Sequence, residues 1–329
     1  MNKSRLIIAV ALVSSLSWFG CNKEGKLNEP STFKTPAGPV ELKLKWTAGE
    51  RIVQDMNMKQ TMEMNLPGRP APMKQEMTMA QEYGLNVLKE TPDGGHEVEM
   101  EFLRTRMSMA MGGKQMADFD SAKKSPENQA GPGGDIFSKI VGSKIRYFLN
   151  ATNGIDRLEG VDELMNKLAA SGQTPEAGAL KGMYNEGFFK QMMSQSRYLP
   201  PKPVTLGDTW PVEVEYPMGS IGTLVLDFTY TMKGWEMHGQ RNCARLDFDG
   251  TVKNKPGTDT AGPMSISSLD GTLSGTSWFD PELGMTIDTA LNQDLTMTMN
   301  LPKAAGAAAP GGMKMQMNQL MTIKMASVK

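Results

Sequence analysis

The residues of this sequence that offer distinctive chemistry are one cysteine near the start and a large set of methionines. Cys21 follows a basic start, with Lys3 and Arg5, and an apolar run over residues 6–16. Such a run is too short to span a bilayer, which takes about 20 residues. A charged start followed by a short apolar run is typical of a cleavable export signal. We therefore predict that residues 1–20 are a lipoprotein signal peptide and that Cys21 carries a diacylglyceryl thioether, which anchors the protein to a membrane.

The alternative is an ordinary secretory signal that is cut at another site, so that Cys21 has no role. Trp18 and Phe19 favour this alternative, because lipoprotein signals usually carry a Leu-like residue and a small residue there. Asn22 follows the cysteine, and the absence of aspartate at that position favours the outer membrane. Residues 21–39 are predicted to be the lipidated cysteine and a flexible polar tether. The expected location is the bacterial cell envelope, at the outer membrane and facing the periplasm.

Methionine accounts for 29 of the 329 residues and recurs at every second position in several segments. This alternation is typical of a β-strand with one apolar and one wet face. Methionine is an adaptable hydrophobic residue that suits promiscuous binding surfaces. The neighbours on the same face include Gln, Leu and Ile, so we predict an apolar wall that either packs as core or lines a groove for a hydrophobic ligand. The residues assigned to the ligand-lining face are Met56, Met58, Met62, Met64, Met77, Met79, Met297 and Met299.

An exported Cu(I)-binding protein is the alternative function, because thioether sulfur is a soft ligand that selects Cu(I). The candidate ligands are Met107, Met109 and Met111, or Met313, Met315 and Met317. Copper sites are usually assisted by a nearby His or Cys, and the chain contains few of either. We therefore predict no resident metal and no cofactor.

Signatures of catalysis are missing from the sequence. There is no Gly-x-Ser-x-Gly elbow, phosphate loop, dinucleotide fingerprint or His-Glu-x-x-His motif. A serine triad would need His96 or His238, which flanking glycines place near turns. Residues Glu97, Glu99 and Glu101 alternate along one strand and are expected on a solvated face. A formal net charge of −1 gives no basic excess for nucleic acid. We expect no enzymatic activity and no nucleic-acid partner.

Long antiparallel strands must position these side chains. Even positions over residues 52–66 are mostly apolar, a Pro-rich turn follows, and a second alternating run covers residues 73–83, which together predict a long hairpin. A third run over residues 96–111 changes parity near Leu103, which predicts a β-bulge. Residues 112–134 are predicted to be an exposed loop. Thr61–Pro67 (TMEMNLP) recurs as Thr296–Pro302 (TMTMNLP), which indicates either duplication or convergent use of one design.

Helices are predicted over residues 135–141, 161–170 and 175–196, with Thr174 capping the last. Strands over 144–149 and 155–158 flank a tight turn at Asn153-Gly154. Further strands are expected over 224–232, 244–252, 285–299 and 313–325. We predict a mainly β (α+β) fold, a long curved antiparallel sheet or half-barrel with a small helical insert. Residues 40–329 would form one domain, in which β segments 40–160 and 203–329 flank a helical segment, 161–199.

Three short stretches resemble a known family. They are Trp46–Arg51 (WTAGER), Asn153–Ile155 (NGI) and Pro203–Trp210 (PVTLGDTW). Together with Cys21 and the chain length, they are similar to a family of uncharacterised bacterial envelope lipoproteins, a domain of unknown function, over most of residues 40–328. The strand pattern also resembles the lipoprotein-carrier half-barrels of the periplasm, in architecture only. The resemblance implies no catalytic residue. We expect a membrane-anchored envelope lipoprotein with a non-catalytic binding or structural role, whose partner is a hydrophobic ligand or an envelope protein.

Overall fold

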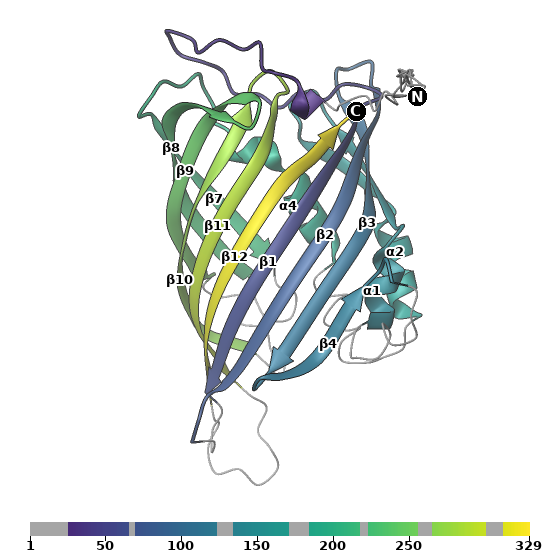
Figure 1. The fold of residues 1–329 in the computed structure, drawn as a ribbon, viewed down its shortest axis with the longest axis vertical. Helices are drawn as coiled ribbons and strands as arrows, with labels where there is room; N and C mark the ends of the chain where they lie inside the picture. The colour runs from purple at the N-terminus through teal and green to yellow at the C-terminus, as the bar shows by residue number, and fades with distance from the viewer. Residues whose placement is uncertain are drawn as a thin grey trace, which may run out of the picture.

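The computed structural model describes residues 26–65, 70–123, 134–170, 184–217, 223–255, 265–300 and 312–329. Within these ranges one antiparallel sheet dominates the fold (Figure 1). Its strands are β1 (Arg51–Asn65), β2 (Met73–Glu90), β3 (His96–Met111), β4 (Lys114–Asp120), β5 (Lys144–Leu149), β6 (Ile155–Glu159), β7 (Thr209–Pro217), β8 (Thr223–His238), β9 (Arg241–Asn254), β10 (Ser265–Asp280), β11 (Met285–Asn300) and β12 (Gly312–Val328).

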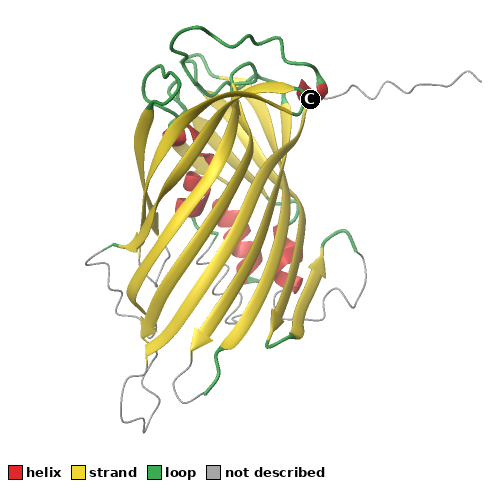
Figure 2. Cartoon of the chain, turned by 60° about the vertical axis from the view of Figure 1, so that its left-hand side comes forward, coloured by secondary structure: helices red, strands yellow, loops and turns green. Residues whose placement is uncertain are grey.

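The strand order is β6-β5-β3-β2-β1-β12-β11-β10-β9-β8-β7, with β4 paired to the far part of β3. Strands β6 and β7 end this order and are not paired to each other, so the sheet is not closed into a barrel. It curves as a half-barrel, with helices on its concave side (Figure 2). The predicted fold class, a long curved antiparallel sheet with a small helical part, is confirmed.

The curvature follows from the length of the strands. Strand β1 has 15 residues and β2 has 18, so each extends about 50 Å or more at ~3.4 Å per residue. Strands twist with a fixed hand, and long ones coil. The register also shifts opposite Leu103, between Glu82 and Tyr83, where the sequence predicted a bulge. The bulge explains why the inner-facing positions change from even to odd numbers along β3.

Three short α-helices lie among the described residues on the concave side: α1 (Gly134–Ile140), α2 (Val161–Ala169) and α4 (Glu186–Met193). Helix α4 is capped by Asn185, whose side chain accepts a hydrogen bond from the Phe188 amide. It buries Phe189, whose ring centroid lies 6.3 Å from that of Phe102 on β3. Helix α4 contacts both β6 and β7, and Gln191 Nε2 donates to the Glu215 carbonyl at 2.9 Å. The helix therefore bridges the two end strands of the sheet.

Residues 26–39, which the sequence assigned to the tether, lie against one end of the sheet. Arg241, 4% exposed, pairs with the fully buried Asp280 and with Glu282. Its guanidinium also donates to the Glu29 carbonyl at 3.2 Å. Glu282 in turn accepts hydrogen bonds from Ser31 and Thr32. Charge-assisted hydrogen bonds thus hold the described part of this segment against the sheet.

One prediction about local structure is wrong in part, and others fall partly or wholly outside the described residues. The expected loop over 112–134 is wrong in its first part, because residues 114–120 form β4 and bury Ala117 and Phe119. The expected helix over 175–196 is described only from residue 184, and its helical part is α4. The proposed cap at Thr174 lies outside the described residues, as do residues 1–20 and Cys21.

Candidate functional site: the inner methionine face

The concave side of β1, β2, β11 and β12 carries no charged side chain. Its positions are every second residue over 52–64, 73–87, 285–299 and 313–325, and they hold only Met, Gln, Leu, Ile, Thr, Tyr and Val. The facing direction is fixed by Gln81 of β2, whose Nε2 donates to the Tyr184 hydroxyl at 2.8 Å next to α4. Burial raises the pKa of Tyr184 to about 12, although this hydrogen bond lowers it. We call these inner positions the methionine face.

Register places methionines from distant segments side by side. Met58 of β1 lies opposite Met79 of β2 and Met321 of β12. Farther along the strands, Met64 lies between Met73 and Met315, and Met297 continues this row on β11. Directly opposite residues have Cβ atoms about 4.5–5.5 Å apart. The methionines therefore form transverse rows across the sheet, which the linear sequence does not show.

All eight residues assigned to the ligand-lining face lie on the methionine face. Met64 and Met299 are buried, with 8% and 6% of their surface exposed. The other assigned residues, Met56, Met58, Met62, Met77, Met79 and Met297, are half-buried. Partial exposure on a concave apolar surface leaves area that a ligand could cover. Their role in binding stays a prediction.

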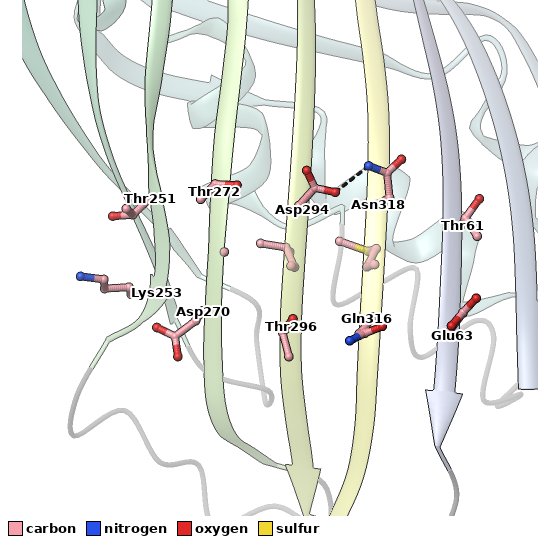
Figure 3. A pocket seen from close by; sticks show the side chains of 13 residues that line it. Thr61, Glu63, Thr251, Lys253, Asp270, Thr272, Asp294, Thr296, Gln316 and Asn318 are labelled. Carbon is pink, nitrogen blue, oxygen red and sulfur yellow. Dashed lines mark hydrogen bonds between the residues drawn. The ribbon is translucent and has the colours of Figure 1, made fainter. Parts of the chain in front are cut away.

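The outer face presents a polar hollow that the sequence analysis did not identify. It is an open depression of about 650 Å³ across β1, β12, β11, β10 and β9. Figure 3 shows its polar side chains. Those on β1, β11 and β12 alternate along each strand with positions of the methionine face. Asn318 Nδ2 donates to Asp294 Oδ1 at 2.6 Å within it. Its other polar lining residues are Thr61, Glu63, Thr251, Lys253, Asp270, Thr272, Thr296 and Gln316. The alternation in the first long strand placed Thr61 and Glu63 on its wet face, but only the register groups them with residues of the other strands.

A second unforeseen cluster surrounds His238. Its Nε2 lies 3.0 Å from Asp288 Oδ2, and its ring stacks on Trp278 with 4.4 Å between centroids. Lys324 Nζ lies 3.4 Å from the same Asp288 oxygen. A His–Asp pair orients the imidazole in hydrolytic triads. Among the described residues, however, no serine or cysteine is hydrogen-bonded to this imidazole, so the pair crosslinks strands without the geometry of a triad.

The remaining residues considered for chemistry are placed as follows. Cys243 is fully buried, and burial raises the pKa of its thiol to about 12, which leaves it a poor nucleophile. Glu97, Glu99 and Glu101 lie on the outer side of β3 and form ion pairs with Lys89, with Lys144 and Arg146, and with Arg51. In the described part of the chain, no group of three or more His, Cys, Asp or Glu side chains could hold a metal ion.

None of the described helices has the length and apolar character needed to cross a bilayer.

His96 begins β3 and is half-buried, and its buried Nδ1 has no hydrogen-bond partner among the residues that the structure describes. It lies opposite Glu90 of β2 and Leu149 of β5. The two histidines are therefore on different hairpins and do not form one site.

Comparison with known proteins gives a family but no activity. The DUF6263 family, described as a family of unknown function, matches residues 93–286, which is more than half of the chain. Two of the stretches quoted from the sequence, Asn153–Ile155 and Pro203–Trp210, fall within that match. No curated protein matches the chain.

Similar solved structures are distant. A lipovitellin structure concerned with lipid–protein interactions is 9% identical with a TM-score of 0.48, and the match covers 87% of this chain but only 26% of lipovitellin. DynF from the dynemicin biosynthesis pathway of Micromonospora chersina is 8% identical with a TM-score of 0.20, and the match covers 89% of this chain and 90% of DynF. A domain described as that of an outer membrane lipoprotein-sorting protein from Vibrio parahaemolyticus is 8% identical with a TM-score of 0.14, and the match covers 85% of each chain. At these TM-scores the similarities carry no functional inference.

Proposed function

The chain belongs to the DUF6263 family, whose function is unknown, and we propose that it is a non-catalytic envelope lipoprotein that binds a hydrophobic ligand along its methionine face. The observation that carries this proposal is the set of half-buried methionines aligned across β2, β1, β12 and β11. They line a concave surface that carries no charge. Location in the cell envelope and anchoring through Cys21 are part of the proposal and rest on the sequence.

The energetics of such a surface favour an apolar ligand. Covering apolar surface yields about 25 cal/mol per Å² removed from water. Methionine is unbranched and polarizable, so it adapts to ligands of different shape. Unpaired charge on a ligand would find no counter-charge on this face and would be costly to bury. The face therefore suits an uncharged aliphatic molecule and not a nucleotide, whose phosphates would be buried without a counter-charge.

A dye-binding experiment tests this proposal. Nile red, an uncharged fluorescent dye, should bind the protein lacking residues 1–21 with increased emission. The variant Met58→Gln/Met79→Gln/Met321→Gln makes one complete row polar and should weaken binding by about tenfold or more, since three methionines lose favourable apolar contact. The matched control Asn57→Gln/Thr78→Gln/Thr322→Gln changes the outer face of the same strands and should bind as the unmodified protein does. Equal binding by both variants, or no binding by the unmodified protein, would contradict the proposal.

Binding of Cu(I) is a second candidate function, favoured by one observation. Met73, Met64, Met315 and Met297 form an uninterrupted row of thioethers across four strands. Two of the sequence-derived candidates, Met313 and Met317, lie one step away on β12, opposite Met299 and Met62. Anaerobic titration of Cu(I) against a competing chelator would test it. Failure of the protein to compete, or unchanged competition in Met64→Leu/Met315→Leu, would remove this candidate.

A further inference from the structure

A belt of uncharged amides lies across three of the four strands of the methionine face. Gln60 of β1 lies directly opposite Gln319 of β12, which lies opposite Gln293 of β11. All three side chains are half-buried, and none has a hydrogen-bond partner among the described residues. Each amide offers donors and acceptors to a bound molecule. We call these three residues the glutamine belt.

Apolar rows lie on both sides of the glutamine belt. Two residues along the strands in one direction are Met58 and Met321, and two residues in the other are Met62 and Met317. The belt is therefore a polar stripe set within an apolar wall. A ligand lying along the strands would place hydrocarbon against the methionines and a single polar region against the amides.

On the same concave side, two further acceptors are buried without hydrogen-bond partners within the part of the chain that the structure describes. They are Oε1 of Gln54, a residue that is 4% exposed, and Oγ1 of Thr105, which is fully buried. By contrast, Gln81 lies between them in the sheet and is hydrogen-bonded to Tyr184. A buried polar atom without a partner is unfavourable by about 1–3 kcal/mol. These positions extend the polar character of the face beyond the belt, again without introducing a charge.

We infer that the ligand of the methionine face is an uncharged amphiphile whose hydroxyl, ester or amide group hydrogen-bonds to the glutamine belt while its hydrocarbon covers the methionine rows. This inference rests on the proposed function and specifies its ligand class. Amides can pair with a neutral polar group in either sense, as donor or acceptor. A carboxylate or phosphate would have to be buried on a face that lacks a cation, which is strongly unfavourable.

Competition between two lipids of equal chain length tests the inference. Monopalmitoylglycerol is neutral and carries hydroxyl and ester groups, whereas palmitate is an anion at pH 8. Each is titrated against Nile red bound to the protein lacking residues 1–21. Monopalmitoylglycerol should displace the dye at a concentration about tenfold lower than palmitate, as a difference of one or two hydrogen bonds requires.

The variant Gln60→Met/Gln293→Met/Gln319→Met preserves side-chain length and removes the amides. It should still bind Nile red but lose the preference for monopalmitoylglycerol. Gln316→Met, on the outer face of β12, is the control and should keep the preference. Circular dichroism checks folding, and if the triple variant is unfolded, Gln319→Met alone should lower the preference by about threefold, consistent with one lost hydrogen bond.

The outcomes separate this inference from the proposed function. Dye binding by the unmodified protein without preference between the two lipids would overturn the inference alone. A preference that survives in the folded triple variant would overturn it as well. Failure of the unmodified protein to bind Nile red would overturn both.

Discussion

Arg241 is a single side chain that ties together three parts of the chain. It pairs with Asp280 and Glu282 and donates to backbone carbonyls of residues 26 and 29. Only 4% of Arg241 and none of Asp280 is exposed. A buried ion pair adds little net stability over an apolar pair, but removal of one partner leaves an uncompensated buried charge. The importance of the Arg241–Asp280 pair can therefore be measured by replacing one of its two partners.

Replacement of Arg241 should therefore be strongly destabilising. Arg241→Met leaves Asp280 buried without its cation and should lower the free energy of unfolding by about 3–5 kcal/mol. Urea unfolding followed by circular dichroism measures this change, and Arg241→Met/Asp280→Asn should recover part of it. The control is Glu186→Gln, which breaks an exposed pair with Lys190 and should change stability by less than ~0.5 kcal/mol. Equal stability of Arg241→Met and the unmodified protein would show that the pair is not required.

At the residue scale, the sequence predicted which face of a long strand each side chain lies on, because side chains alternate with a period of two. Met58 and Met79 were assigned to one face because alternation alone fixes which side of a strand a residue faces. The stacking of His238 on Trp278 and its contact with Asp288 could not be predicted, because these residues come from three different strands. Such contacts depend on register, which local sequence does not specify.

At the scale of elements, a glycine on β10 allows close packing between β9 and β10. A Cβ atom on Gly275 would lie 2.2 Å from the Ala290 carbonyl oxygen and 2.5 Å from Cζ of Phe248. The Phe248 ring therefore packs directly over this glycine. A missing side chain at one position allows close approach of an aromatic ring from the neighbouring strand.

Gly275→Ala should accordingly destabilise the protein by about 1–3 kcal/mol, because the added methyl group overpacks the site. Gly38→Ala is the matched control, since a Cβ atom there would meet nothing within 4 Å. The melting temperature of each variant reports the effect. If Gly275→Ala and the control had the same melting temperature, the Phe248 ring would be able to move aside without loss of stability.

The elements that escaped prediction lack a clear alternating pattern. Strand β10 is rich in Ser, Thr and Gly, and its glycines at 271 and 275 interrupt the apolar positions. Strand β4 is short, but Gly112 and Gly113 both have positive φ, 58° and 78°. Two such glycines between strands are a recognised hairpin signal, so β4 could have been found from the sequence. The long strands were predictable because their alternation extends over many residues.

At the scale of the whole molecule, the pairing of β1 with β12 creates the methionine face. This pairing joins the first and last long strands of the chain. It also places the described parts of the two repeated stretches, residues 61–65 and 296–300, on either side of β12. Alternation predicted each apolar strand face, but the strand order that aligns those faces depends on contacts between residues more than 200 positions apart. The curved charge-free surface is thus a property of the complete sheet.

Native mass spectrometry of the protein lacking residues 1–21, purified without detergent and then mixed with monopalmitoylglycerol, is the most direct test of the central claim. We predict a protein mass with a bound apolar molecule, either retained from the cells or taken up from solution, and loss of that adduct in Met58→Gln/Met79→Gln/Met321→Gln. A bare protein mass that acquires no lipid, or an adduct that persists equally in this variant, would contradict binding at the methionine face.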